Sequence, residues 1–182
     1  MSVDGTDFRI RQQGYATKGH PFASHKYKGK SALRYELAID IIEGNLVRIE
    51  GPYPAGKYPD ITIFRLGIKH DLDPNERVLA DKGYVGEAPE FIKCPNCPTV
   101  PEHHLPMQAC VMKRHETFNG RLKNWGILEQ VFPQQDITQH GDVPRNCQLR
   151  MVSHCSRLST MMLVGSRVHR SNNSQQFTPS HR

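Results

Sequence analysis

The sequence predicts an α/β fold with a mixed sheet and flanking helices, on two observations. Apolar and β-branched residues concentrate in four short segments, at 1–10, 33–42, 45–50 and 77–80, which is typical of strands. Helical signals appear at 60–67 and at 107–128. The predicted order is three strands, a helix, a strand, an irregular segment and a helix, and 182 residues suffice for one domain with a sizeable core.

The first part of the chain predicts a strand followed by a hairpin. Residues 1–10 alternate in part and indicate a strand that is broken at the turn-like step Asp4-Gly5-Thr6. Residues 11–30 are rich in Gly, Lys and His and predict an exposed loop. The segments 33–42 and 45–50 are then expected to pair as an antiparallel hairpin around the short turn Glu43-Gly44.

The second part predicts two helices with a short strand between them. The Pro/Gly-rich segment 51–59 ends the first sheet run, and Asp60 lies near the N-cap of a helix over 60–67. Residues 77–80 indicate a short buried strand that ends at Asp81. Residues 86–106 are rich in Pro, Cys and His and predict a long irregular insertion, which a helix over 107–128 follows.

On the late helix, polar and apolar residues fall on opposite faces at about 100° per residue. The polar face carries Glu116, Asn119, Gly120 and Lys123, and the apolar face carries Val111, Phe118, Leu122 and Trp125. We expect the apolar stripe to pack on the sheet and to present Glu116 and Lys123 together at a polar cleft. A polar face that is simply solvated is the alternative that periodicity leaves open.

Composition indicates an intracellular chain with a polyanionic partner. The formal net charge is +6, which suits a nucleic acid, although many basic proteins have no such role. No apolar run approaches the length of a membrane span, and the first residues lack the features of a signal peptide. Five cysteines are an odd number, and without an export signal they do not predict a disulfide framework.

The last part of the chain differs in composition from the rest. Residues 143–182 hold six arginines and three histidines but no lysine, aspartate or glutamate. We expect residues 133–182 to form an atypical and largely disordered tail. Either a basic nucleic-acid-binding extension or a decayed end that never packs would account for it.

Three carboxylates in distinctive surroundings are the strongest chemical signal: Asp4, Asp60 and Glu116. If the fold brings them together, they supply the hard oxygen ligands that two divalent cations need for cutting phosphodiester bonds. Basic side chains suited to DNA phosphates accompany them. These are Lys26, Lys28, Lys30 and Arg34, interleaved with Tyr27 and Tyr35, and then Arg114 and Lys123. A solvated basic loop is the alternative for residues 26–34.

The chain resembles the DDE-superfamily endonuclease domain of insertion-sequence and PIF/Harbinger-like transposases. The resemblance covers about residues 1–132 and includes Asp4-Gly5-Thr6, the segment from Gly51 to Asp60, Ala80-Asp81-Lys82-Gly83-Tyr84, and the segment from His115 to Lys123. It implies a ribonuclease-H-like core, with carboxylates on the first strand, near a later strand end and on a late helix. The implied activity is metal-dependent hydrolysis and strand transfer of DNA.

The resemblance also assigns roles to residues. It implies Asp4, Asp60 and Glu116 as catalytic and metal-binding residues, with two Mg²⁺ or Mn²⁺ ions as cofactors. Lys123 matches the lysine of an E-x6-K pattern, and Asp81 matches a recurrent position that we expect to cap the loop carrying Tyr84. A separate DNA-binding partner protein and, in a eukaryotic host, a nuclear location are further implications.

Two departures from the family pattern stand out. An arginine expected four residues before Glu116 is replaced by Met112, so Lys113 or Arg114 would have to bind phosphate instead. Only three residues precede Asp4, where relatives usually carry a helical DNA-binding region, so we expect an N-terminally truncated copy. A catalytically dead remnant or a domesticated DNA-binding protein is therefore an alternative to an active nuclease.

A zinc-stabilised DNA-binding module is the second alternative. Cys94 and Cys97 form a CxxC pair, and His103 and Cys110 follow within reach of a tetrahedral site. The spacing matches no common zinc finger, and a zinc ion there would staple the insertion rather than act in catalysis.

Overall fold

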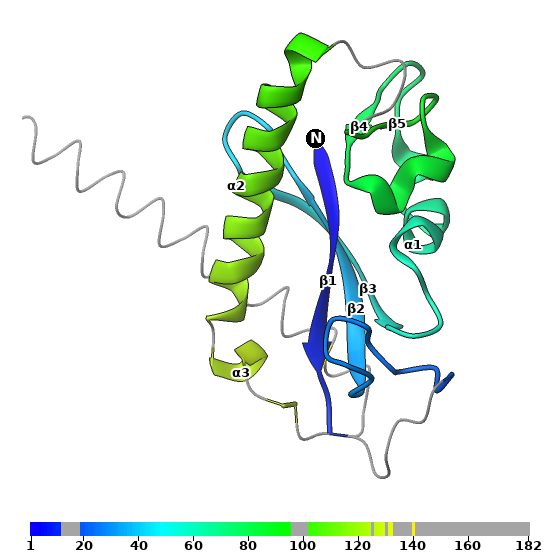
Figure 1. The fold of residues 1–182 in the computed structure, drawn as a ribbon, viewed down its shortest axis with the longest axis vertical. Helices are drawn as coiled ribbons and strands as arrows, with labels where there is room; N and C mark the ends of the chain where they lie inside the picture. Colours follow the sequence, from blue (N-terminus) through cyan, green and yellow to red (C-terminus); the bar gives the residue numbers. More distant parts are fainter. Residues whose placement is uncertain (12–18, 96–101, 125, 130, 133–139, 141–182) are drawn as a thin grey trace, which may run out of the picture. The chain divides into compact units, whose positions relative to one another are not determined.

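The computed structural model describes residues 1–11, 19–95, 102–124, 126–129, 131–132 and 140 (Figure 1). Its strands are β1 (Ser2–Arg9), β2 (Ala32–Ile39), β3 (Leu46–Pro54), β4 (Val78–Leu79) and β5 (Ile92–Lys93). Its α-helices are α1 (Asp60–Leu66), α2 (Leu105–Lys123) and α3 (Gly126–Glu129), and three 3₁₀ turns are η1 (Ile68–Asp71), η2 (Lys82–Glu87) and η3 (Glu102–His104). Among these described residues, no helix is both long and apolar enough to cross a membrane.

The five strands form one mixed sheet in the order β3-β2-β1-β4-β5. β1, β2 and β3 are antiparallel neighbours, whereas β4 pairs in parallel with both β1 and β5. Parallel neighbours need a crossover, and α1 lies in the connection that brings the chain from β3 back to β4 beside β1. The α/β class with a mixed sheet and helices is confirmed.

β1 is one continuous strand, so the predicted break at Asp4-Gly5-Thr6 is wrong. These residues pair in unbroken register with Leu37, Glu36 and Tyr35 of β2. Glycine is usually unfavourable inside a strand, but here another side chain fills the space where a Cβ would stand. The local turn signal was therefore overridden by a tertiary contact.

The predicted hairpin of β2 and β3 is present with shifted ends. β2 ends at Ile39 rather than at residue 42, and β3 continues through Gly51 to Pro54 instead of ending at residue 50. Gly51 has φ +130°, and the register with β2 shifts between Arg34 and Glu36. The irregular backbone lets a Pro/Gly-rich segment remain in the sheet.

The hydrophobic core on one side of the sheet joins α1 to the strands β4 and β5. Its buried members are Val3, Ala38, Phe64, Ile68, Val78, Ala80, Tyr84, Ile92 and Cys94. The last two belong to the segment predicted to be an irregular insertion, which instead contributes β5 and buried side chains to the sheet. Residues 96–101 of that segment lie outside the described residues.

The late helix is divided in two, α2 and α3, around Asn124, where one helix over 107–128 was predicted. Figure 1 shows α2 running alongside β1, and a contact of 3.1 Å between Ser2 Oγ and His115 Nδ1 joins them. The buried stripe of α2 is Gln108, Val111, His115, Asn119 and Leu122. It is more polar than the predicted stripe: Phe118 is only half-buried, and the side chain of Trp125 lies outside the described residues.

One described residue beyond position 132 packs on the sheet. The ring of His140 is buried and packs against Phe8 and Phe132. Its Nδ1 atom shares a 2.6 Å hydrogen bond with the hydroxyl of Tyr35. The prediction of a disordered tail otherwise concerns residues outside the described part of the chain.

Candidate active site

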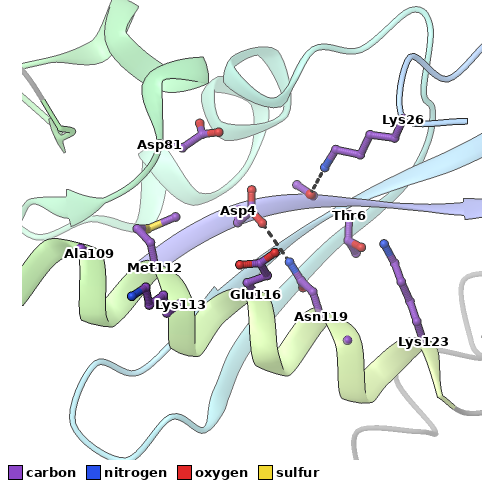
Figure 2. Close-up of a pocket in the computed structure, with 12 residues that line it drawn as sticks. Asp4, Thr6, Lys26, Asp81, Ala109, Met112, Lys113, Glu116, Asn119 and Lys123 are labelled. Atoms are coloured by element: carbon purple, nitrogen blue, oxygen red, sulfur yellow. Dashed lines mark hydrogen bonds between the residues drawn. The ribbon is translucent and has the colours of Figure 1, made fainter. Parts of the chain in front are cut away.

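A pocket of about 530 Å³ opens between β1 and α2 (Figure 2). Four parts of the chain line it: β1, the loop before β2, the turn that follows β4, and one face of α2. The lining residues are Asp4, Gly5, Thr6, Lys26, Asp81, Ala109, Met112, Lys113, Glu116, Asn119, Gly120 and Lys123. The pocket therefore gathers two of the three predicted catalytic carboxylates, Asp4 and Glu116.

Asp4 is the most buried carboxylate of the pocket, and α2 holds it in place. Asn119 Nδ2 donates a 2.8 Å hydrogen bond to Asp4 Oδ2. The pKa of Asp4 is raised to about 6, mainly by burial and in smaller part by the nearby carboxylates Asp81 and Asp60, whereas the charge of Lys26 offsets part of this rise. A carboxylate in such surroundings favours a neighbouring cation.

Glu116 faces the same pocket from α2, where it is exposed. The helical wheel predicted that Glu116 and Lys123 would share one cleft, and both side chains do line it (Figure 2). Met112, at the position of the missing arginine, also lines the pocket. Lys113 lines it too, whereas Arg114 Nη1 donates to the carbonyl oxygens of Ile41 and Ile42.

Asp60 meets β1 from the opposite face of the sheet. A Cβ built on Gly5 would lie 2.0 Å from Asp60 Oδ1. Because successive side chains of a strand point to opposite faces, the contact with Gly5 puts Asp60 on the face away from Asp4 and Thr6. On its own face Asp60 lies 3.3 Å from Arg34 Nη1, and burial raises its pKa. Asp60 does not line the pocket.

Asp81 is the third carboxylate of the pocket. It lies two residues after the end of β4, and its side chain accepts a 2.7 Å hydrogen bond from the Gly83 amide. The expected capping role is thus confirmed, with Tyr84 fully buried behind the turn. Sequence reasoning missed that the capping carboxylate also faces Asp4. The signal that could have revealed it is its position directly after the strand that pairs with β1.

The three pocket carboxylates do not form a preassembled ligand cluster. Within the described ranges, no group of three or more His, Cys, Asp or Glu side chains is arranged so that it could hold a metal ion. Two oxygen atoms near Asp4 nevertheless lack a hydrogen-bond partner among the described residues, Thr6 Oγ1 and Asn119 Oδ1. Both belong to buried residues that line the pocket. The carboxylates and Asn119 Oδ1 supply hard oxygen donors, which suits Mg²⁺ or Mn²⁺.

The basic residues predicted to bind DNA occupy different surroundings. Lys26 and Lys123 line the pocket, and Lys26 Nζ donates a 2.5 Å hydrogen bond to the Gly5 carbonyl. Lys28 and Lys30 are exposed on the same loop, outside the pocket. Arg34 is buried: its guanidinium pairs with Asp7 at 2.7 Å, so a role in tracking a DNA backbone does not fit its place in the fold.

The predicted zinc ligands show no common site among the described residues. Cys94 is buried in the core cluster, whereas His103 and Cys110 are exposed. Cys97 lies outside the described residues. The burial of Cys94 among apolar side chains indicates a packing role.

Comparison with known proteins gives no independent identification. No protein-family model, no curated protein and no solved structure matches the chain. The functional assignment therefore depends on the residues of the pocket and on their surroundings.

Proposed function

We propose that the protein is a metal-dependent DNA endonuclease of the DDE type, built on a ribonuclease-H-like core. The observation that carries the proposal is the shared pocket of Asp4, Asp81 and Glu116, flanked by lysines. The resemblance implies carboxylates on the first strand, near a later strand end and on a late helix. Asp4 on β1, Asp81 after β4 and Glu116 on α2 have these three positions.

Asp81 replaces Asp60 as the third carboxylate in this proposal. Asp60 is on the other face of β1, where Arg34 compensates its charge at 3.3 Å. Its function there is to support the strand under Asp4 by filling the space beside Gly5. Asp81 has no salt bridge within the described residues and faces the pocket.

Mg²⁺ or Mn²⁺ bound by Asp4, Asp81 and Glu116 would activate the attacking oxygen and stabilise the leaving oxygen at phosphorus. The residues of the chain prepare the pocket for this chemistry. Asn119 fixes the orientation of the Asp4 carboxylate through its amide hydrogen bond. Asp81 is held by the Gly83 amide, and the positive charges of Lys26 and Lys123 attract the DNA backbone.

Nicking of supercoiled plasmid DNA tests the proposal. The wild-type protein should nick with Mg²⁺ or Mn²⁺ and not in EDTA. Asp4→Asn and Glu116→Gln should each lower the rate at least about 100-fold, because each removes a metal-binding charge. Glu129→Gln is the matched control, since Glu129 is an exposed carboxylate on α3 outside the pocket. Equal nicking by all four proteins would overturn the assignment.

A DNA-binding protein without nuclease activity is the second candidate. It is favoured by the lack, among the described residues, of a ready three-ligand group. In that case the protein binds plasmid DNA, but neither metal produces nicks above the EDTA control. Binding without metal-dependent nicking would select this candidate.

A further inference from the structure

The pocket is divided by charge along its length. The carboxylates Asp4, Asp81 and Glu116 lie toward one end in Figure 2, with Lys113 beside them, and the side chains of Lys26 and Lys123 lie together toward the other end. Thr6 lies at the basic end, two residues along β1 from Asp4 and therefore on the same face of the strand. The basic end has no part in the proposed metal chemistry, and a general attraction of its lysines for DNA leaves the role of Thr6 unexplained.

Thr6 presents a buried hydroxyl to this end of the pocket. The residue is 1% exposed, and Thr6 Oγ1 has no hydrogen-bond partner in the part of the chain that the structure describes. A buried polar atom without a partner lowers stability, so such an atom on a pocket wall indicates a ligand that completes it. A hydroxyl can donate to an anionic oxygen.

Lys26 and Lys123 bring two positive charges to the same place. Within the described residues, neither ammonium group has a carboxylate oxygen within 4.0 Å. Lys26 Nζ donates to a backbone carbonyl, that of Gly5, next to Thr6. Burial lowers the pKa of Lys123, and the charge of Lys26 lowers it further, so the two ammonium groups disfavour each other. An anion between them would remove this repulsion.

We propose that Thr6, Lys26 and Lys123 form a binding subsite for one phosphate group of a nucleic-acid backbone, beside the phosphate that is cut. The inference rests on the function proposed above and extends it to the substrate. The acidic end takes the scissile phosphodiester with its cations, and the basic end takes a neighbouring phosphate. The substrate is therefore a strand with at least two consecutive phosphodiesters, held from two sides, and not a mononucleotide.

Binding without catalysis tests the subsite. A short fluorescein-labelled oligothymidylate is titrated with the full-length protein in EDTA, and anisotropy is followed over a range of salt concentrations. Lys26→Gln should weaken binding about tenfold and lower the log–log salt slope by about 0.7, as expected for one lost phosphate contact on a single strand. Lys30→Gln is the matched control, because Lys30 is an exposed lysine of the same loop outside the pocket. Binding should change by less than about twofold in the control.

Thr6→Val separates a ligand role from a structural one. Valine has nearly the shape of threonine without the hydroxyl, so the variant should keep or raise the melting temperature while weakening binding about threefold or more. An oligothymidylate with uncharged methylphosphonate linkages identifies the chemistry. Its binding should be equally weak to the wild type and to Lys26→Gln.

The outcomes separate the subsite from the nuclease. If these variants lose binding and the wild type never nicks DNA, the subsite stands and the proposed function fails. If the wild type nicks DNA but Lys26→Gln and Thr6→Val bind like the Lys30→Gln control, the subsite is overturned. Inorganic phosphate that competes equally well with the wild type and with Lys26→Gln would also overturn it.

Discussion

Replacement of Gly5 by alanine tests the packing that separates Asp60 from the pocket. The new Cβ would stand 2.0 Å from Asp60 Oδ1 and 2.5 Å from Asp60 Cγ, where ordinary contacts begin at 3.4 Å. Either β1 or the start of α1 must therefore move by roughly 1.4 Å, and the pairing of Asp60 with Arg34 must change with it. Overpacking of this kind costs about 1–3 kcal/mol.

The assay is urea unfolding at equilibrium, with Gly5→Ala measured alone and in an Asp60→Ala background. Without the Asp60 carboxylate the clash is absent, and the change should be neutral or stabilise by about 0.5–1 kcal/mol, because alanine is preferred to glycine inside a strand. Gly120→Ala is a second control. Nothing lies within 4 Å of the site of its Cβ, so it should stabilise α2 by about 1 kcal/mol. An equal loss of stability from Gly5→Ala in both backgrounds would refute the contact.

Two further changes probe buried charges. Glu36 is fully buried, and burial raises its pKa to about 8, so the folded state holds a proton that the unfolded state releases near pH 4.5. Between about pH 6.5 and about 8, above the range in which Asp4, His115 and His140 change protonation, wild-type stability should fall by at most about 1.4 kcal/mol per unit. Glu36→Gln should remove this fall in urea unfolding at several pH values between these limits. A slope unchanged in the variant would contradict the assignment to Glu36. Asp7→Ala should cost about 3–5 kcal/mol, because it leaves the buried Arg34 without its main partner at 2.7 Å. A thermal-shift loss no larger than that of the exposed Glu129→Gln would contradict it.

Much of the fold could be predicted from local signals. The β2–β3 hairpin, the start of α1 at Asp60, and the presence of β4 and α2 follow from alternation, capping residues and helical periodicity. The predicted break in β1 was wrong, because the turn signal of Asp4-Gly5-Thr6 carries no information about the Asp60 side chain that fills the space beside Gly5. The buried stripe of α2 was missed in part because His115 and Asn119 are polar residues that pack through hydrogen bonds.

The candidate site could be predicted only in part, because it also depends on contacts between residues that are far apart in sequence. Asp4 and Glu116 were identified from their surroundings in sequence, and they do line one pocket. The side of β1 on which Asp60 lies depends on strand register and on the path of the chain after β3, which no local pattern contains. Asp81 enters the pocket because β4 pairs with β1, a contact between residues far apart in sequence.

Metal-dependent plasmid nicking by Asp81→Asn and Asp60→Asn, measured side by side, decides which of the two aspartates is the third catalytic carboxylate. We expect Asp81→Asn to lose nicking while both proteins still bind DNA. We expect Asp60→Asn, which keeps the shape beside Gly5, to retain measurable metal-dependent nicking. Loss of nicking in Asp60→Asn with full activity in Asp81→Asn would exclude Asp81 and would restore Asp60 as the third catalytic carboxylate.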